Sequence, residues 1–121
     1  LDAASGELPV VISLGPEDLP LLLDTLIAQQ PAAVILLPPR GTLPDAAGRP
    51  VSGRLYGPAL FPLTLATLQR LADTGLRLIT CGGVFTQAAA QALLDAGAYA
   101  VGLDAALWGV NPNKIFSKPV A

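Results

Sequence analysis

The sequence of 121 residues contains no histidine and only one cysteine, Cys81. Histidine is the commonest general base and the commonest metal ligand in proteins, so both roles would have to fall to other residues. A single cysteine excludes an intrachain disulfide and any cluster of cysteine ligands. Cys81 itself follows an apolar run directly and is best interpreted as a small buried apolar side chain.

Charged residues are also scarce, at 13% of the chain against the roughly 25% typical of a soluble domain. Such a surface has too few charges to cover itself, which indicates that part of it is buried against other protein. The formal net charge of −2 and the lack of a basic run argue against a nucleic-acid partner. No stretch reaches the roughly 20 apolar residues of a membrane span, and no signal peptide is recognised, so a cytoplasmic location is expected.

Short apolar runs alternate with segments of helical periodicity. The runs predict strands buried on both faces, at residues 10–14, 33–37, 76–80 and 99–103. Helices are predicted from about Pro16 to Pro31, over 61–73 and over 86–96, with Gly75 and Thr86 as caps.

The stretch over residues 39–59 is rich in glycine and proline and predicts a long loop, either functional or disordered. Arg40, Arg49 and Arg54 lie in or beside it. They are interpreted as solvated loop charges, although one of them could contact a phosphate or an acidic substrate.

This alternation predicts an α/β fold with a parallel sheet covered on both faces. No break in composition divides the chain, so residues 1–121 are expected to form a single domain. Periodicity leaves two arrangements open, an open three-layer sandwich and an arc of a barrel. An arc would expose apolar inner faces and two strand edges, which suits a chain with few charges that is completed by other protein.

Four motifs follow one another in the second half of the chain. They are GRLYGPALFPLTL at 53–65, CGGVFT at 81–86, LLDAGAYAVGLDAALW at 93–108, and Val110-Asn111-Pro112. In this order they resemble the late barrel segments of the dihydroorotate dehydrogenase family, closest to the bacterial type that works with an electron-transfer partner subunit. The resemblance implies the C-terminal half of a (β/α)8 TIM barrel, with four parallel strands alternating with helices and a site for flavin mononucleotide (FMN). It also implies an oxidoreductase by ancestry, acting on dihydroorotate to give orotate in pyrimidine biosynthesis.

The resemblance places the FMN phosphate on the backbone amides of Gly57, Gly82 and Gly83, with Asp104 and Ala105 closing the site. Glycine turns beside a helix N-terminus do form anion sites, and in barrels such a site lies at the carboxyl end of the strands. Ordinary turn chemistry is the alternative interpretation of each glycine. Asp104 stands where the family usually has glycine, and its carboxylate would repel a phosphate.

Other family positions are altered as well. Ser13 stands in place of a lysine that contacts the flavin ring, Leu37-Pro38 in place of a pair whose asparagine holds orotate, and Tyr56 in place of a serine. The family's catalytic base belongs to the earlier half of the barrel, so no catalytic residue is assigned here. These changes imply an incomplete or impaired enzyme, partnered by the rest of the barrel or by another chain that covers the apolar strand edges. Two alternatives stay open, a non-catalytic structural or assembly module and a binding module for another phosphorylated ligand.

Overall fold

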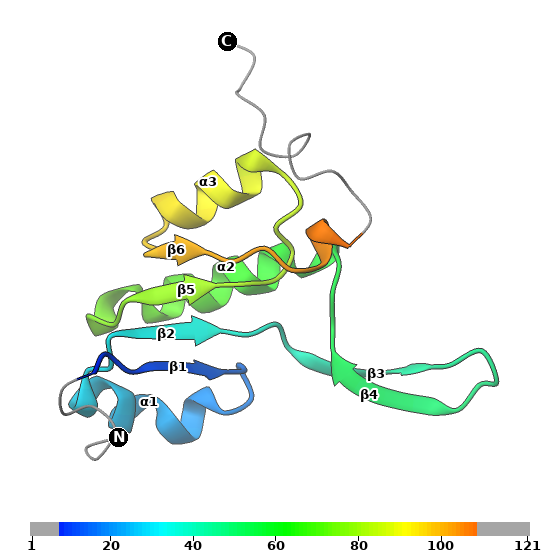
Figure 1. Ribbon diagram of the computed structural model, residues 1–121, viewed down its shortest axis with the longest axis horizontal. Coiled ribbons are helices and arrows are strands. Elements are labelled where there is room, and N and C mark those ends of the chain that lie inside the picture. Colours follow the sequence, from blue (N-terminus) through cyan, green and yellow to red (C-terminus); the bar gives the residue numbers. More distant parts are fainter. Residues whose placement is uncertain (1–7, 109–121) are drawn as a thin grey trace, which may run out of the picture.

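The computed structural model describes residues 8–108, which form a four-stranded parallel sheet, three α-helices and a separate antiparallel hairpin (Figure 1). The sheet consists of β1 (Val11–Leu14), β2 (Ala33–Leu36), β5 (Leu78–Thr80) and β6 (Ala100–Val101). The helices are α1 (Leu19–Gln29), α2 (Phe61–Leu71) and α3 (Gln87–Asp95), and short 3-10 turns are η1 (Pro58–Leu60), η2 (Ala72–Thr74) and η3 (Ala105–Leu107). The predicted alternation of strands and helices is thereby confirmed, while the motif at Val110-Asn111-Pro112 lies outside the described residues.

The ends of the helices follow the local sequence. The Thr86 hydroxyl accepts a hydrogen bond from the Ala89 amide at 3.1 Å, which caps the first turn of α3 as predicted. Gly75 has φ +78° after η2. Gln30 has φ +48° and stops α1 one residue before Pro31, so the predicted end is also confirmed.

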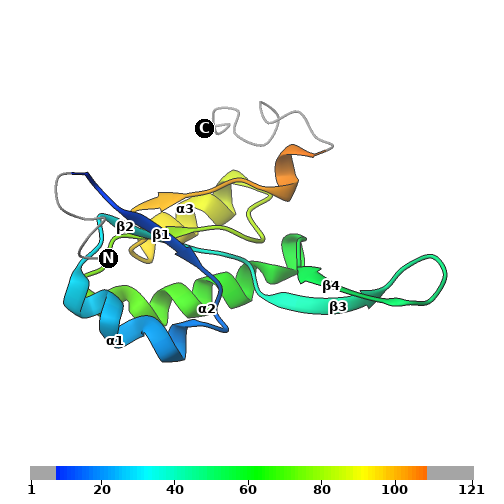
Figure 2. The same ribbon diagram turned by 60° about the horizontal axis from the view of Figure 1, so that its bottom comes forward.

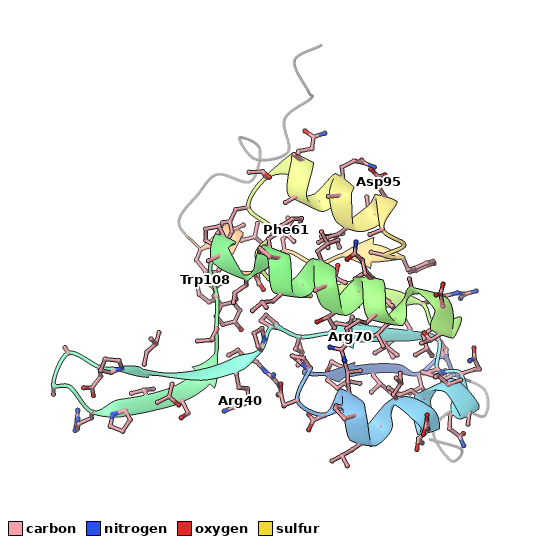
Figure 3. All side chains as sticks on the ribbon, turned by 180° about the vertical axis from the view of Figure 1, so that it is seen from behind. Arg40, Phe61, Arg70, Asp95 and Trp108 are labelled. Carbon is pink, nitrogen blue, oxygen red and sulfur yellow. The ribbon has the colours of Figure 1, made fainter. Side chains whose placement is uncertain are left out.

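All helices lie on one face of the sheet. The strand order β1-β2-β5-β6 never reverses, and right-handed crossovers that all step in the same direction place their helices on the same side. Figure 2 shows α1 and α2 side by side along this face, and Figure 3 shows α2 in front of the sheet with α1 and α3 on either side of it. Figure 1 shows the opposite face without a helix over it. The expectation of a sheet covered on both faces was therefore wrong for residues 8–108.

The two faces of the sheet differ because side chains alternate along each strand. On the helix side, Val34, Leu36 and Leu78 are almost completely buried and pack in one core with Leu68 and Leu93 of the helices. The intervening residues face away from this core. They include Val11, which is 51% exposed, and the half-buried register partners Ile35 and Ile79. An apolar sheet face is thus left open.

The predicted long loop contains the β-hairpin of β3 (Arg40–Pro44) and β4 (Pro50–Arg54), which projects from the sheet (Figure 1). The Asp45 carboxylate accepts hydrogen bonds from the amides of Ala47 and Arg49 at 2.9 Å each and so closes the turn. Across the hairpin, the hydroxyls of Thr42 and Ser52 are 2.8 Å apart. The loop prediction for this stretch was wrong, because side-chain bonds in the turn fix the register despite its prolines and glycines.

Arg54 ties the base of the hairpin to the loop that precedes α1. Its guanidinium donates to the Glu17 carboxylate at 2.5 Å and to the Pro38 carbonyl at 3.0 Å. The guanidinium lies across Gly15, where a Cβ atom would overlap it. The pKa of Glu17 is lowered by a hydrogen bond from the Glu17 backbone amide and by the neighbouring Arg54 guanidinium. Arg54 is therefore a structural contact and not the solvated charge that the sequence predicted.

None of the helices between residues 8 and 108 combines the length and the apolar character that a membrane crossing requires.

Candidate functional site

Three turns meet at the carboxyl ends of the parallel strands. The first contact joins the turn after β5 to the start of α2. A Cβ atom on Gly83 would lie 2.6 Å from the Phe61 Cα and 2.9 Å from the Leu60 carbonyl carbon, and would overlap the Phe61 nitrogen. Only a glycine can come this close, so Gly83 lies directly against the N-terminus of α2.

The Gly82–Gly83 turn offers two amide donors. Both residues are buried and both have positive φ values, +111° and +77°. The buried Thr64 hydroxyl holds the turn by donating to the Gly82 carbonyl at 2.9 Å. Between residues 8 and 108, neither glycine amide donates to a protein acceptor. Buried amides are rarely left without an acceptor, so this turn suits an anion or an ordered water.

Gly57 begins the second turn, immediately before η1 and α2. Its φ is +142°, and its carbonyl accepts from the Leu60 amide at 3.2 Å. No atom lies within 4 Å of the position that a Cβ would take. The structure thus places Gly57 beside the helix start on which Gly83 packs, with open space on the side where a side chain would project.

The third turn follows β6 and is held to both of the others. A Cβ on Gly102 would overlap the Cys81 sulfur, which is how closely this strand end approaches the turn after β5. Further along the chain, the centroid of the Trp108 ring lies 4.8 Å from the centroid of the Tyr56 ring, and the two ring planes are inclined at 58°. The fold therefore brings the predicted site residues to one edge of the sheet, namely Gly57, Gly82, Gly83, Asp104 and Ala105.

Asp104 and Ala105 interact with each other within this third turn. The Asp104 carboxylate accepts from the Ala105 amide at 2.6 Å and caps η3. Its second oxygen is buried and has no hydrogen-bond partner within the described part of the chain. The Ala105 amide is thus already bonded, and a negative charge stands at the position where the resemblance would have glycine. The amides of the glycine pair have no acceptor among residues 8–108 and could donate to an anion, whereas the Asp104 carboxylate would repel one.

Cys81 is half-buried between these turns. Burial raises the pKa of its thiol, and the nearby Asp104 carboxylate raises it further, while a hydrogen bond with the Gly102 backbone acts in the opposite direction. The thiol is therefore protonated at neutral pH. Because the folded state holds this proton more tightly than the unfolded chain does, the protonated thiol favours the folded state. This contribution to stability is fully present below the pKa of an unfolded cysteine and is lost as the pH rises through the raised pKa of Cys81.

Asp104→Asn is expected to lower the pKa of Cys81 and to speed its alkylation by iodoacetamide at pH 8, because the nearest negative charge is removed. The alkylation rate, followed by mass spectrometry, measures this effect. Asp95→Asn serves as the control, since it removes an equal charge from the exposed end of α3. Equal rates in both variants would show that Asp104 does not act on the thiol.

The altered family positions offer little chemistry. Ser13 is exposed on the open sheet face, where it pairs in register with Ile35. The Leu37 amide donates to the Leu14 carbonyl at 2.9 Å, and Pro38 is buried. Among residues 8–108, no three side chains of the metal-binding types gather, and none of the altered positions supplies a cation.

Sequence reasoning missed Thr64. It lies on the buried stripe of α2 with Leu68 and Leu71, so a hydroxyl in an apolar stripe was the available signal. The contact between Tyr56 and Trp108 had no signal in the sequence.

Neither the protein-family models nor the curated proteins match this chain. The resemblance to dihydroorotate dehydrogenases therefore stays a prediction from the motifs.

Proposed function

We propose that this chain is the FMN-binding half of a β/α barrel of the dihydroorotate dehydrogenase kind. The observation that carries the proposal is the pair of buried amides of Gly82 and Gly83, which have no acceptor among residues 8–108 and lie beside the N-terminus of α2. Successive amides next to a positive helix end provide the geometry that a phosphate needs. Gly57 leaves open space on the same edge of the sheet.

The half-barrel origin is supported by topology. Four parallel strands follow one another without reversal, the helices occupy one face, and the other face is apolar. In a closed barrel that other face lines the interior and is filled by side chains from further strands. The rest of the barrel or another chain would therefore cover Ile35 and Ile79.

This chain's own residues bind and orient more than they react. The glycine amides would hold the phosphate, and the Thr64 hydroxyl fixes their turn through the Gly82 carbonyl. When bound, FMN supplies the electron-transfer chemistry of an oxidoreductase. Ser13 provides no positive charge near a reduced flavin ring, and Leu37-Pro38 provides no side-chain group for orotate. The proposed role is thus a flavin-holding domain, oxidoreductase by ancestry and catalytically impaired in these positions.

Titration with FMN, followed by quenching of flavin fluorescence, tests the proposal against riboflavin, which lacks the phosphate. We expect FMN to bind at least tenfold more tightly than riboflavin, because charged hydrogen bonds contribute about 1.5–3 kcal/mol each. Gly57→Ala should weaken FMN binding, since its Cβ enters the open space. Gly48→Ala is the matched control, because Gly48 also has a positive φ, +79°, also meets no atom within 4 Å, and lies in the turn of the hairpin. Equal affinities for FMN and riboflavin, or no quenching at all, would contradict a phosphate site.

A second candidate function is a non-catalytic assembly module, and Asp104 favours it. Its carboxylate already bonds the Ala105 amide and places a negative charge beside the glycine turns. In that case the open sheet face is the functional surface. A chain that fails to bind FMN but still associates through the face of Ile35 and Ile79 would support this candidate over the first.

A further inference from the structure

A cavity of about 280 Å³ opens on the helix side of the sheet, between α2 and the loop that leads into α1. Its floor is formed by the end of β2 and by the residues that follow β5. Its lining includes Leu37, Leu63, Ala66, Thr67, Arg70 and Cys81. A cavity of roughly 150 Å³ suffices for benzene, so this one has room for a ligand of two fused rings.

The α2 side of the cavity is a single stripe of the helix. Leu63, Ala66, Thr67 and Arg70 stand at i, i+3, i+4 and i+7, which places them in one row along the helix. The row runs from an exposed leucine at the carboxyl edge of the sheet to an arginine near the other end. Figure 3 shows Arg70 on the flank of α2 that faces α1. The cavity therefore has an apolar body and one charged end.

The polar groups in the lining restrict what can bind. The Thr64 and Thr67 hydroxyls donate to the carbonyls of Gly82 and Leu63, at 2.9 and 3.0 Å. The Cys81 thiol is kept neutral by burial. Arg70 has no hydrogen bond and no carboxylate within 4.0 Å in the described part of the chain. The cavity is thus complementary in charge to an apolar molecule that bears a single negative group.

We infer that this cavity binds a small amphipathic anion, an aromatic or short aliphatic monocarboxylate, with its apolar part on Leu37 and Ala66 and its carboxylate on Arg70. The cavity borders the glycine turns at Thr64 and Cys81, whereas Ala66 and Arg70 lie further along α2. The inference does not depend on FMN binding. It lies on the outer side of the sheet, so it would stay accessible when other protein covers the face of Ile35 and Ile79.

The probe is 2-naphthoate, titrated into the ¹⁵N-labelled chain and compared with the neutral 2-naphthalenemethanol. A ligand of this size is expected to bind with a Kd of about 1 mM and to shift the amides of the cavity lining. Arg70→Gln should weaken naphthoate about fivefold, the effect expected of an exposed charge pair, and leave the neutral compound unchanged. Ala66→Leu, which fills the cavity, should abolish the binding of both compounds.

Arg77→Gln is the matched control, because it removes the same charge from an exposed arginine that lies over the Tyr99 ring, outside the cavity. It should bind naphthoate as the unaltered chain does. The inference would be overturned by equal affinities in the two arginine variants, by shifts centred on Ile35 and Ile79, or by no saturable shift with 2-naphthoate.

Discussion

Replacing Gly83 with alanine is expected to lower the free energy of unfolding by about 2–5 kcal/mol, the largest effect of any single substitution at the site. A left-handed backbone conformation costs a non-glycine residue about 1–2 kcal/mol, and Gly83 has φ +77°. In addition, the new Cβ would overlap backbone atoms of Phe61, which cannot move aside as a flexible side chain could. Such overpacking costs a further 1–3 kcal/mol or so. Urea denaturation followed by circular dichroism measures the sum.

Gly48→Ala is the control that measures the cost of the left-handed backbone conformation without any steric overlap. Gly48 has nearly the same φ, +79°, but no atom lies within 4 Å of its would-be Cβ, and it stands at the tip of the hairpin. We expect this variant to lose only about 1 kcal/mol. If both alanine variants unfolded at the same urea concentration, the close packing of Gly83 on the start of α2 would be contradicted.

Leu78→Ala is the second change with a large expected effect, about 2–5 kcal/mol of destabilisation, because it opens a cavity in a packed core. Leu78 is only 1% exposed and lies on the helix side of β5. Its neighbour Ile79 points to the open face, so Ile79→Ala should cost about 1 kcal/mol in the isolated chain. Leu78 and Ile79 are adjacent, large and apolar, so the difference between the stability losses of their alanine variants tests which face of the sheet is covered.

Thermal unfolding of the two variants gives the comparison, and the same pair reports on a covering partner. When other protein closes the open face, Ile79→Ala should weaken the association while Leu78→Ala should not do so directly. Similar losses of stability in the isolated chain would mean that both faces of the sheet are buried.

Much of the fold followed from periodicity. Continuous apolar runs separated by helical spacing predicted the parallel strands, and Thr86 marked the start of α3 correctly. Gly75 follows the 3-10 turn η2, whereas α2 itself ends earlier, at Leu71. The sequence could not show which faces of the sheet are covered, because Val34 and Ile35 are equally apolar and only their three-dimensional surroundings differ. A run of apolar residues predicts a strand that is buried on both faces. The pattern is the same whether the second face is covered by the chain itself or by other protein.

The hairpin was missed for a local reason. Pro44 pairs with Pro50 and Gly41 with Gly53, and all four residues have low strand propensity. Two sets of side-chain contacts outweigh that propensity. The Asp45 carboxylate accepts from two amides of the turn, and Arg54 bonds Glu17 at the base of the hairpin. Both are side-chain contacts whose geometry cannot be read from spacing.

The candidate site was only partly predictable. The structure brings Gly57, Gly82 and Gly83 to one edge of the sheet, as expected because turns after parallel strands meet there, while their role in binding a phosphate stays a prediction. Charge repulsion marked Asp104 as discordant, but only the structure shows that its carboxylate bonds the Ala105 amide. The arrangement is thus a glycine turn whose amides have no acceptor among residues 8–108, with the Asp104 carboxylate close to the adjoining Cys81.

The most direct test is to follow the amide resonances of Gly82 and Gly83 in the ¹⁵N-labelled chain during titration with FMN. We expect both amide protons to move downfield along one saturable curve, as donors do when they gain a charged acceptor, and to stay in place with riboflavin. Amides that remain still while FMN is added to excess, or that respond equally to riboflavin, would show that this turn binds no phosphate.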